Sequence, residues 1–126
     1  MTNEELKILI CDDSLLARKS LRDALKNAGC TEIKEVYDGQ SAVDSYKEDK
    51  PDIVFLDIVM PVKDGITAAR EIREFDENAY IIMVSSVGTQ LHLREAIKAG
   101  AKDFLQKPPT PEQVKNVLSQ VTGEER

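Results

Sequence analysis

The stretch PDIVFLD, residues 51–57, decides the fold, because an unbroken apolar run in it ends abruptly in an aspartate. Two other runs have the same form: residues 8–11 end in a pair of aspartates, and residues 80–84 end in Ser85. An apolar run without polar alternation is typical of a strand that is covered on both faces, as in a parallel sheet. The three runs therefore predict the central strands of an α/β fold.

Helical patterns lie between these runs, and the first and the last are the clearest. Ser14 can cap a helix whose apolar residues recur every three or four positions until Gly29, which can end it. Thr110 and Gln113 form a capping box around Pro111, and apolar residues follow at helical spacing. Both segments are predicted helices.

The remaining elements have weaker patterns. Three more helices are predicted, one after Gly39, one after Gly65 and one before Gly100. Two short, partly polar segments, residues 33–36 and 103–106, are typical of edge strands. Strand and helix thus alternate along the chain, which predicts a parallel sheet wound on both faces with right-handed crossovers.

The composition is that of one small acidic domain. Among 126 residues, 17 are basic and 23 acidic, which gives a net charge of −6. This balance disfavours direct binding to nucleic acid, and the longest apolar run, residues 80–84, is too short for insertion into a membrane. We expect a single domain over residues 1–126, with a core at about residues 7–121.

The cysteine content suggests a reducing compartment. Cys11 and Cys30 are too few for a disulfide scaffold, which predicts free thiols and a cytoplasmic protein. Cys11 lies inside a predicted strand and is expected to pack in the core. Cys30 follows the end of a predicted helix and is expected to be a surface thiol.

Reactive side chains follow the predicted strands at their carboxyl ends. Asp12 and Asp13 follow the first strand, Asp57 the third, Ser85 the fourth and Lys107 the fifth. Because ligands of an open parallel sheet bind beyond these ends, the side chains are expected to share one cleft. Clustered carboxylates need a cation to remain ionised, and a set of ligands made only of oxygen suits Mg²⁺ or Mn²⁺.

The aspartate pair also has a simpler interpretation. Asp12 and Asp13 precede Ser14, so they could serve only to cap the helix that follows. The residues by themselves leave the capping role and the metal role open.

Four segments, in this order and at these separations, resemble the receiver domain of response regulators in two-component phosphorelays. They are LICDDS (9–14), PDIVFLDIVMPVKDG (51–65), IIMVSS (81–86) and EAIKAGAKDFLQKP (95–108). The likeness is closest to the stand-alone, CheY-like chemotaxis regulators and covers nearly the whole chain. It implies a flavodoxin-like, doubly wound sheet of five parallel strands in the order 2-1-3-4-5, with five helices.

The resemblance assigns a role to each residue of the cleft. Asp57 would be the phosphoacceptor, taking its phosphoryl group from a phosphohistidine on a sensor histidine kinase. Asp13, Asp57 and the main-chain carbonyl of Val59 would hold Mg²⁺ directly, and Asp12 would act largely through bound water. Lys107 would pair with a phosphoryl oxygen. The chain would then be no enzyme beyond its own phosphorylation and dephosphorylation.

The resemblance also implies a switch that reaches a partner-binding surface. Ser85 would donate its hydroxyl to the new phosphoryl group, and Phe104 would turn inward in concert. A downstream protein would bind through the fourth helix, the fifth strand and the fifth helix. Val59 and Val87 would line the cleft with apolar side chains that cannot orient water, which predicts slow self-dephosphorylation. The peptide bond between Lys107 and Pro108 is a candidate for the cis form.

Other functions fit the residues less well. A phosphohydrolase of the haloacid-dehalogenase type needs a second aspartate two residues after the first, where this chain has Val59. A flavodoxin-like cofactor binder needs a first loop that cradles phosphate, where Asp12 and Asp13 would repel it. A receiver fragment of a larger regulator and a docking module that is not phosphorylated stay open as alternatives.

Overall fold

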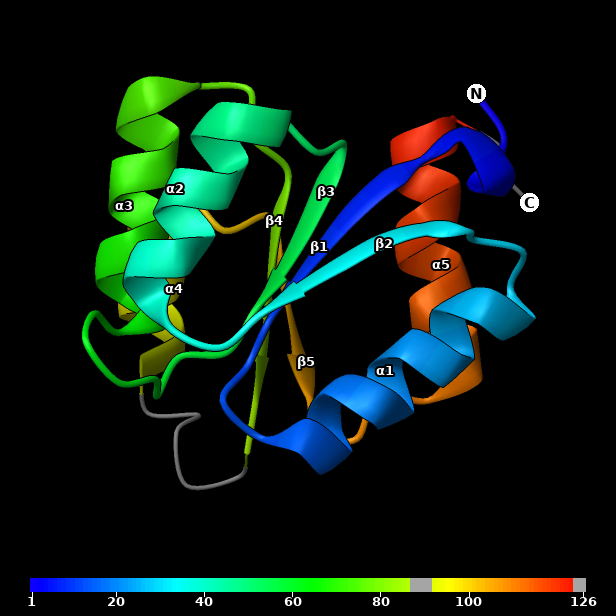
Figure 1. Cartoon of the computed structure of the whole chain (residues 1–126), viewed down its shortest axis with the longest axis horizontal. Coiled ribbons are helices and arrows are strands. Elements are labelled where there is room, and N and C mark those ends of the chain that lie inside the picture. Colours follow the sequence, from blue (N-terminus) through cyan, green and yellow to red (C-terminus); the bar gives the residue numbers. More distant parts are fainter. Residues whose placement is uncertain (87–91, 124–126) are drawn as a thin grey trace.

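The computed structural model describes residues 1–86 and 92–123, and these form a parallel sheet with helices on both of its faces (Figure 1). The strand order is β2-β1-β3-β4-β5, as expected. The strands are β1 (Lys7–Cys11), β2 (Glu32–Val36), β3 (Ile53–Leu56), β4 (Ile81–Ser85) and β5 (Asp103–Gln106). The helices are α1 (Leu15–Asn27), α2 (Gly39–Asp49), α3 (Gly65–Phe75), α4 (Leu93–Lys98) and α5 (Pro111–Thr122), after a short 3-10 turn, η1 (Asn3–Glu5).

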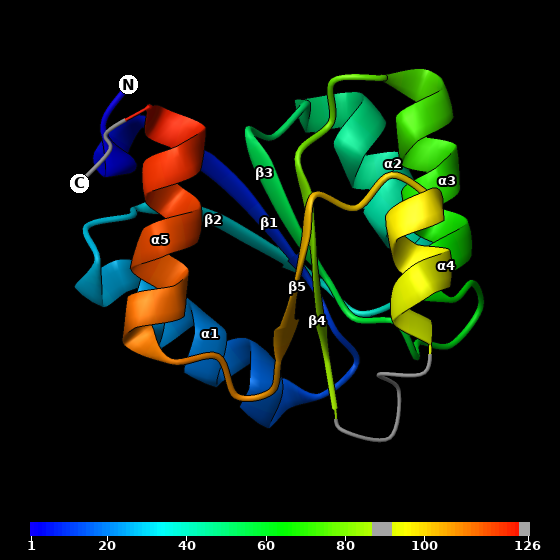
Figure 2. The same ribbon diagram turned by 180° about the vertical axis from the view of Figure 1, so that it is seen from behind.

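The two faces of the sheet are covered by different helices, as the front and back views show (Figures 1 and 2). Helices α2, α3 and α4 lie on one side, and α1 and α5 lie on the other. Along β1, Leu9 and Cys11 pack into the first layer, whereas Ile8 and Ile10 pack into the second. Successive side chains of a strand point to opposite faces, so a strand buried on both needs an unbroken apolar run. This explains the three runs in the sequence.

The end of α1 corrects the expectation for Cys30, which is buried rather than at the surface. Gly29 adopts a positive φ of 102°, and its amide donates to the carbonyl of Lys26. The Cys30 amide donates to the carbonyl of Leu25, which completes a Schellman motif. This motif turns the chain inward, and Cys30 joins the apolar cluster that contains Leu25.

The helix ends predicted from sequence are confirmed. The Ser14 hydroxyl accepts a hydrogen bond from the Ala17 amide, and Thr110 and Gln113 form the reciprocal bonds of a capping box at α5. The apolar pattern of α4 is less well buried than expected, since Leu93 and Ile97 are 39% and 48% exposed. In the part of the chain that the structure describes, no helix combines the length and the apolar character that crossing a membrane requires.

The loop between β3 and α3 closes tightly over the end of β3. The Gly65 amide donates to the carbonyl of Ile58 at 2.7 Å. A Cβ at Gly65 would overlap the carbonyl oxygen of Asp57, so only glycine fits this approach. Within the same loop Val62 has a φ of 69°, which is unusual for a β-branched residue, and its side chain is 83% exposed.

Candidate functional site

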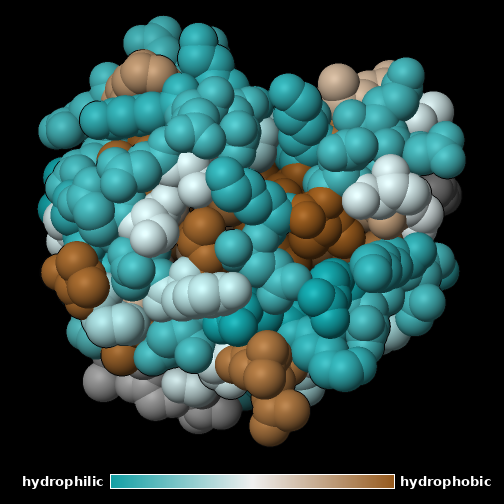
Figure 3. Space-filling view, viewed as in Figure 1, coloured by the Kyte–Doolittle hydropathy of each residue, from teal (hydrophilic) through white to brown (hydrophobic). Residues whose placement is uncertain are grey.

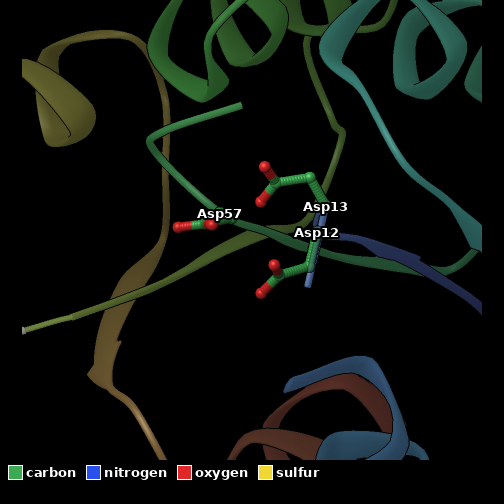
Figure 4. Close-up of side chains that lie close together, drawn as sticks. All are labelled: Asp12, Asp13 and Asp57. Carbon is green, nitrogen blue, oxygen red and sulfur yellow. The ribbon is translucent and has the colours of Figure 1, made fainter. Parts of the chain in front are cut away.

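Three carboxylates meet at the carboxyl ends of β1 and β3 (Figure 4). Oxygen atoms of Asp12, Asp13 and Asp57, one from each side chain, all lie within 4.8 Å of one another. Asp12 and Asp57 are buried, with 5% and 6% of their surface exposed, whereas Asp13 is open to solvent. The parallel topology therefore brings these predicted residues into one acidic cluster.

Lys107 is the cation that faces this cluster. Its Nζ lies 2.7 Å from Oδ2 of Asp12 and 3.0 Å from Oδ2 of Asp57. The Lys107 amide donates to the carbonyl of Ser85 at 2.8 Å, which fixes the backbone beside β4, and its bond to Pro108 is cis, as expected. Burial lowers the pKa of Lys107, but the hydrogen bonds to the two aspartates outweigh it and the net pKa is raised. The ammonium therefore stays charged at neutral pH.

The surroundings of Asp57 disfavour the ionised form of its carboxyl group. Burial raises the pKa of Asp57, and the neighbouring charge of Asp12 raises it further, while the hydrogen bond from Lys107 acts in the opposite direction. The Asp57 amide donates to the carbonyl of Cys11 at 2.9 Å, so its backbone is tied to the end of β1. The result is a fixed carboxylate with little water around it and one close cation.

The capping interpretation of the aspartate pair is wrong for this structure. Ser14 is the residue that caps α1, since its hydroxyl accepts the amide of Ala17 at 3.2 Å. Asp12 accepts the amide of Ser14 at 2.9 Å, which forms a turn before the helix rather than a cap. The carboxylates of Asp12 and Asp13 therefore belong to the cleft.

The other predicted residues differ in their burial and contacts. Ser85 is fully buried at the end of β4, and its hydroxyl donates to the carbonyl of Ser86 at 3.4 Å. Phe104, on β5, is half-buried and packs against the apolar cluster beneath α2, α3 and α4. Val59 is 58% exposed, and Val87 lies outside the described residues.

Sequence reasoning missed one residue that touches this site. Arg18 of α1 is only 7% exposed, and its Nη1 donates to the main-chain carbonyl of Asp12 at 2.7 Å. The signal was available, since Arg18 precedes the buried Leu21 and Leu25 at helical spacing and so falls on the inner face of α1. An arginine on such a face needs a buried partner.

The donor set fits a hard divalent cation. All three clustered side chains are carboxylates, which Mg²⁺ and Mn²⁺ prefer over softer ligands. The cluster also opens to solvent on the Asp13 side, which leaves a path for entry. Beside it lies a cleft of about 270 Å³, lined by Asp57, Lys107 and apolar side chains that include Leu16. An apolar group is exposed at the surface where α1 begins (Figure 3). At this end of the helix, Leu15 and Leu16 are 68% and 79% exposed.

Comparison with known sequences gives consistent relatives. The family described as "Response regulator receiver domain" matches residues 8–119. The chemotaxis protein CheY of Thermotoga maritima is 47% identical over 116 residues, which cover 92% of this chain and 97% of that protein. The CheY of Bacillus subtilis is 47% identical over 102 residues, covering 81% and 85%.

Solved structures agree in fold. A complex of CheX, CheY, beryllofluoride and Mg²⁺ from Borrelia burgdorferi contains a chain that is 38% identical, with a TM-score of 0.84 and coverage of 93% of this chain and 89% of that one. The receiver domain of a sensor histidine kinase from Pseudomonas aeruginosa, with magnesium in its active-site cleft, is 27% identical, with a TM-score of 0.84 and coverage of 94% and 98%.

The acidic cluster thus occurs in a chain that is similar over nearly its full length to CheY proteins. The chain belongs to the response regulator receiver domain family, and is a signalling protein of the CheY-like kind rather than a conventional enzyme.

Proposed function

We propose that this protein is a switch that accepts a phosphoryl group on Asp57 from the phosphohistidine of a sensor histidine kinase. The observation that carries the proposal is the position of Lys107, whose ammonium contacts Asp57 at 3.0 Å and Asp12 at 2.7 Å. A buried carboxylate with a charged lysine beside it, at the open end of a parallel sheet, suits phosphoryl transfer.

The nucleophile of the covalent step is the Asp57 carboxylate. An oxygen of the Asp57 carboxylate attacks phosphorus, the bond between phosphorus and the histidine nitrogen breaks, and the imidazole keeps the electron pair. The product is an acyl phosphate on Asp57. Lys107, which stays protonated, pairs with a phosphoryl oxygen and offsets the charge that the group brings.

Mg²⁺ is the cofactor that we propose, with Mn²⁺ as a substitute. Asp13, Asp57 and the main-chain carbonyl of Val59 would hold it, and Asp12 would act through water. The short separation of the three carboxylates supports this set, and two structural relatives are described with magnesium. When bound, the cation would neutralise charge on the phosphoryl oxygens.

The switch would act through Ser85 and Phe104. Within the described part of the chain, the hydrogen bond that the Ser85 hydroxyl donates is long, 3.4 Å to the carbonyl of Ser86, so a phosphoryl oxygen would be a stronger acceptor. Phe104 is half-buried on the neighbouring strand, where it pairs with Met83, two residues before Ser85, and inward rotation would change the surface of β5.

The partner would bind the surface formed by α4, β5 and α5. This surface already presents apolar and basic side chains, since Ile97 is 48% exposed and Lys98 and Lys102 are exposed. Apolar side chains with a charged rim are typical of protein interfaces. The CheY of the Borrelia complex is bound to another protein, CheX, which supports a protein as the partner of this chain.

Incubation with acetyl phosphate and Mg²⁺, followed by intact mass at mildly acidic pH, tests the acceptor. We expect one phosphoryl group on the wild type, none on Asp57→Asn and none with EDTA. Asp23→Asn is a matched control, because Asp23 lies on the exposed face of α1 in an ion pair with Lys19. An adduct on Asp57→Asn, or no adduct on the wild type, would overturn the proposal.

The switch is tested with beryllofluoride and Mg²⁺ on the isotope-labelled protein. We expect amide shift changes at Phe104 and along α4 in the wild type. In Ser85→Ala these changes should be lost although the ligand still binds. Equal changes in both proteins would exclude Ser85 as the relay.

A further inference from the structure

We propose that Arg18 is a positioning residue that fixes the Asp12–Asp13 peptide for divalent-cation binding, and that Glu35 and Tyr37 hold it in place. The proposal deepens the proposed function and rests on it, because it assigns a residue outside the acidic cluster to the order of that cluster. Arg18 would act on the main chain of the first loop, which joins β1 to α1, and would not itself be a ligand of the cation.

Asp12 is restrained at every polar group that it carries. Its amide donates to the carbonyl of Val36 at 3.2 Å, and its carbonyl accepts from Nη1 of Arg18 at 2.7 Å. Its carboxylate accepts from the Ser14 amide at 2.9 Å and from Lys107 at 2.7 Å. The carbonyl of Asp12 belongs to the same planar peptide as the nitrogen of Asp13. Holding that oxygen therefore sets the direction in which the Asp13 side chain leaves the backbone.

Arg18 can do this because it is itself held on two further sides. Its Nε donates to Oε1 of Glu35 at 3.1 Å, and its guanidinium lies 4.1 Å from the centre of the Tyr37 ring. The other oxygen of Glu35 accepts from Nη1 of Arg22 at 2.7 Å. A planar guanidinium with fixed donors keeps its orientation better than an ammonium would. Arg18 thus connects the end of β1 to the end of β2.

Packing alone does not explain an arginine at this position, because burying its charge is energetically unfavourable. The position lies on the buried stripe of α1 with Leu21 and Leu25, where a methionine or leucine would fill the space without a buried charge. The group that needs the charge is the Asp12 carbonyl, since its buried hydrogen bond comes from Arg18 and no other donor to this oxygen is found among the described residues. We therefore assign the arginine to the geometry of the loop.

Residues that orient metal ligands affect affinity without touching the metal. Loss of such a partner typically weakens metal binding by about 10- to 100-fold. With Arg18 removed, the Asp12–Asp13 peptide can rotate, and Asp13 no longer stays close to Asp57. The effect should fall on the cation affinity and much less on phosphoryl transfer once the cation saturates the site.

The experiment is calorimetric titration of Mg²⁺ into the wild type, Arg18→Met and Arg22→Met, with thermal unfolding to show that each is folded. Arg22 is the matched control, because it lies one turn later on α1 and shares Glu35, but contacts no atom of the first loop in the described hydrogen bonds. We expect the Kd of Arg18→Met to rise roughly 10-fold and that of Arg22→Met to stay within about twofold. Arg18→Lys should lie between the wild type and Arg18→Met, because an ammonium keeps the charge but lacks the planar set of donors that reaches Glu35 and the carbonyl in fixed directions.

A second readout separates positioning from a general loss of structure. With acetyl phosphate, the half-saturating Mg²⁺ concentration should rise in Arg18→Met, while the rate at saturating Mg²⁺ falls by less than about threefold. An unchanged Kd in a folded Arg18→Met, or an equal rise in Arg22→Met, overturns this proposal alone. A wild type that binds no Mg²⁺ and takes no phosphoryl group overturns the proposed function and this proposal together.

Discussion

The ammonium of Lys107 lies 3.0 Å from Oδ2 of Asp57, although 50 positions separate the two residues in the chain. The same ammonium also reaches Asp12, so it acts as the counterion of two buried carboxylates. A divalent cation would neutralise the same carboxylates. If the proposed cation binds, lysine and metal would therefore make overlapping contributions to the stability of the site.

Replacing Lys107 by Met tests this overlap. In EDTA we expect the free energy of unfolding to fall by roughly 2 kcal/mol, because Asp12 and Asp57 lose their shared partner. In excess Mg²⁺ the loss should be smaller, because the metal supplies the missing charge. Urea denaturation in both buffers measures the difference. Lys34→Met removes an exposed ion pair with Asp49 and should cost less than about 1 kcal/mol in either buffer.

We expect Val59 to lengthen the lifetime of the phosphoryl group. Its side chain is 58% exposed two residues after Asp57, where a polar group could orient an attacking water. We expect Val59→Asn to shorten the half-life of the acyl phosphate roughly 5-fold, because it would position that water. The decay of the phosphorylated mass with time gives the rate. Val62→Asn, an equally polar change on the same loop, should leave it unaltered, and equal lifetimes for wild type and Val59→Asn would contradict the prediction.

Gly65 is required by the close approach of α3 to Asp57. A methyl group there would overlap the Asp57 carbonyl and crowd the Cα of Ile58, both of which are backbone and cannot move aside cheaply. We expect Gly65→Ala to destabilise the protein by about 2 kcal/mol and to slow phosphorylation. The control is Gly123→Ala, whose added methyl meets nothing within 4 Å and feels only the strain of a positive φ of 81°. A loss no larger than that of the control would contradict the steric argument.

The hydrogen bond between Tyr46 and Asp76 gives stability that depends on pH. The Tyr46 hydroxyl donates to Oδ2 of Asp76 at 2.7 Å, and this bond, with the amide of Asn78, lowers the pKa of Asp76. A lowered carboxyl pKa contributes stability above the unfolded pKa, and the contribution is lost as the pH falls through the folded pKa. We expect Tyr46→Phe to cost about 1 kcal/mol at pH 7 and less under acid conditions.

Denaturation at several pH values checks the Tyr46 prediction. Tyr80→Phe serves as the comparison, since the Tyr80 hydroxyl donates to the neutral amide oxygen of Gln120 at 3.0 Å. The free energy of unfolding lost in Tyr80→Phe should be independent of pH in the acid range, because Gln120 carries no titratable group. A Tyr46→Phe cost that is constant from neutral to acid pH would show that Asp76 plays no part.

Val62 combines an unfavourable backbone with an exposed apolar side chain. Its φ of 69° lies in the left-handed region, which asparagine tolerates and β-branched residues avoid. We expect Val62→Asn to stabilise the protein by roughly 0.5–1 kcal/mol, measured by thermal unfolding. Val59→Asn changes the same residue type without that strain and should stay within about 0.5 kcal/mol of the wild type.

The central sheet and the acidic cluster were predictable because both depend on local pattern and topology. Unbroken apolar runs mark strands buried on two faces, and parallel strands carry the residues after them to one edge. Asp12, Asp13 and Asp57 follow directly from this rule. The edge strands were also recognised, although the polarity of β2 was attributed only to its position at the edge.

What the sequence did not reveal depends on contacts between distant segments. Glu35 is polar because it pairs with Arg18 and Arg22 across from α1, which no local pattern can show. Cys30 is buried because the Schellman motif turns it toward Leu25. The direction that the chain takes after a helix depends on the apolar residues against which it packs. The residue types at positions 29 and 30 alone therefore do not predict that Cys30 is buried.

The two buried thiols lie in different layers of the protein. Cys11 packs beneath α2, α3 and α4, whereas Cys30 packs beneath α1 and α5. Burial raises the pKa of both thiols, so alkylation at neutral pH has to wait until the covering layer opens. The alkylation rate of each cysteine therefore reports how often the helices on its face of the sheet open. Equal labelling rates would mean that the two faces open as a single cooperative unit, and unequal rates would rank them by local stability.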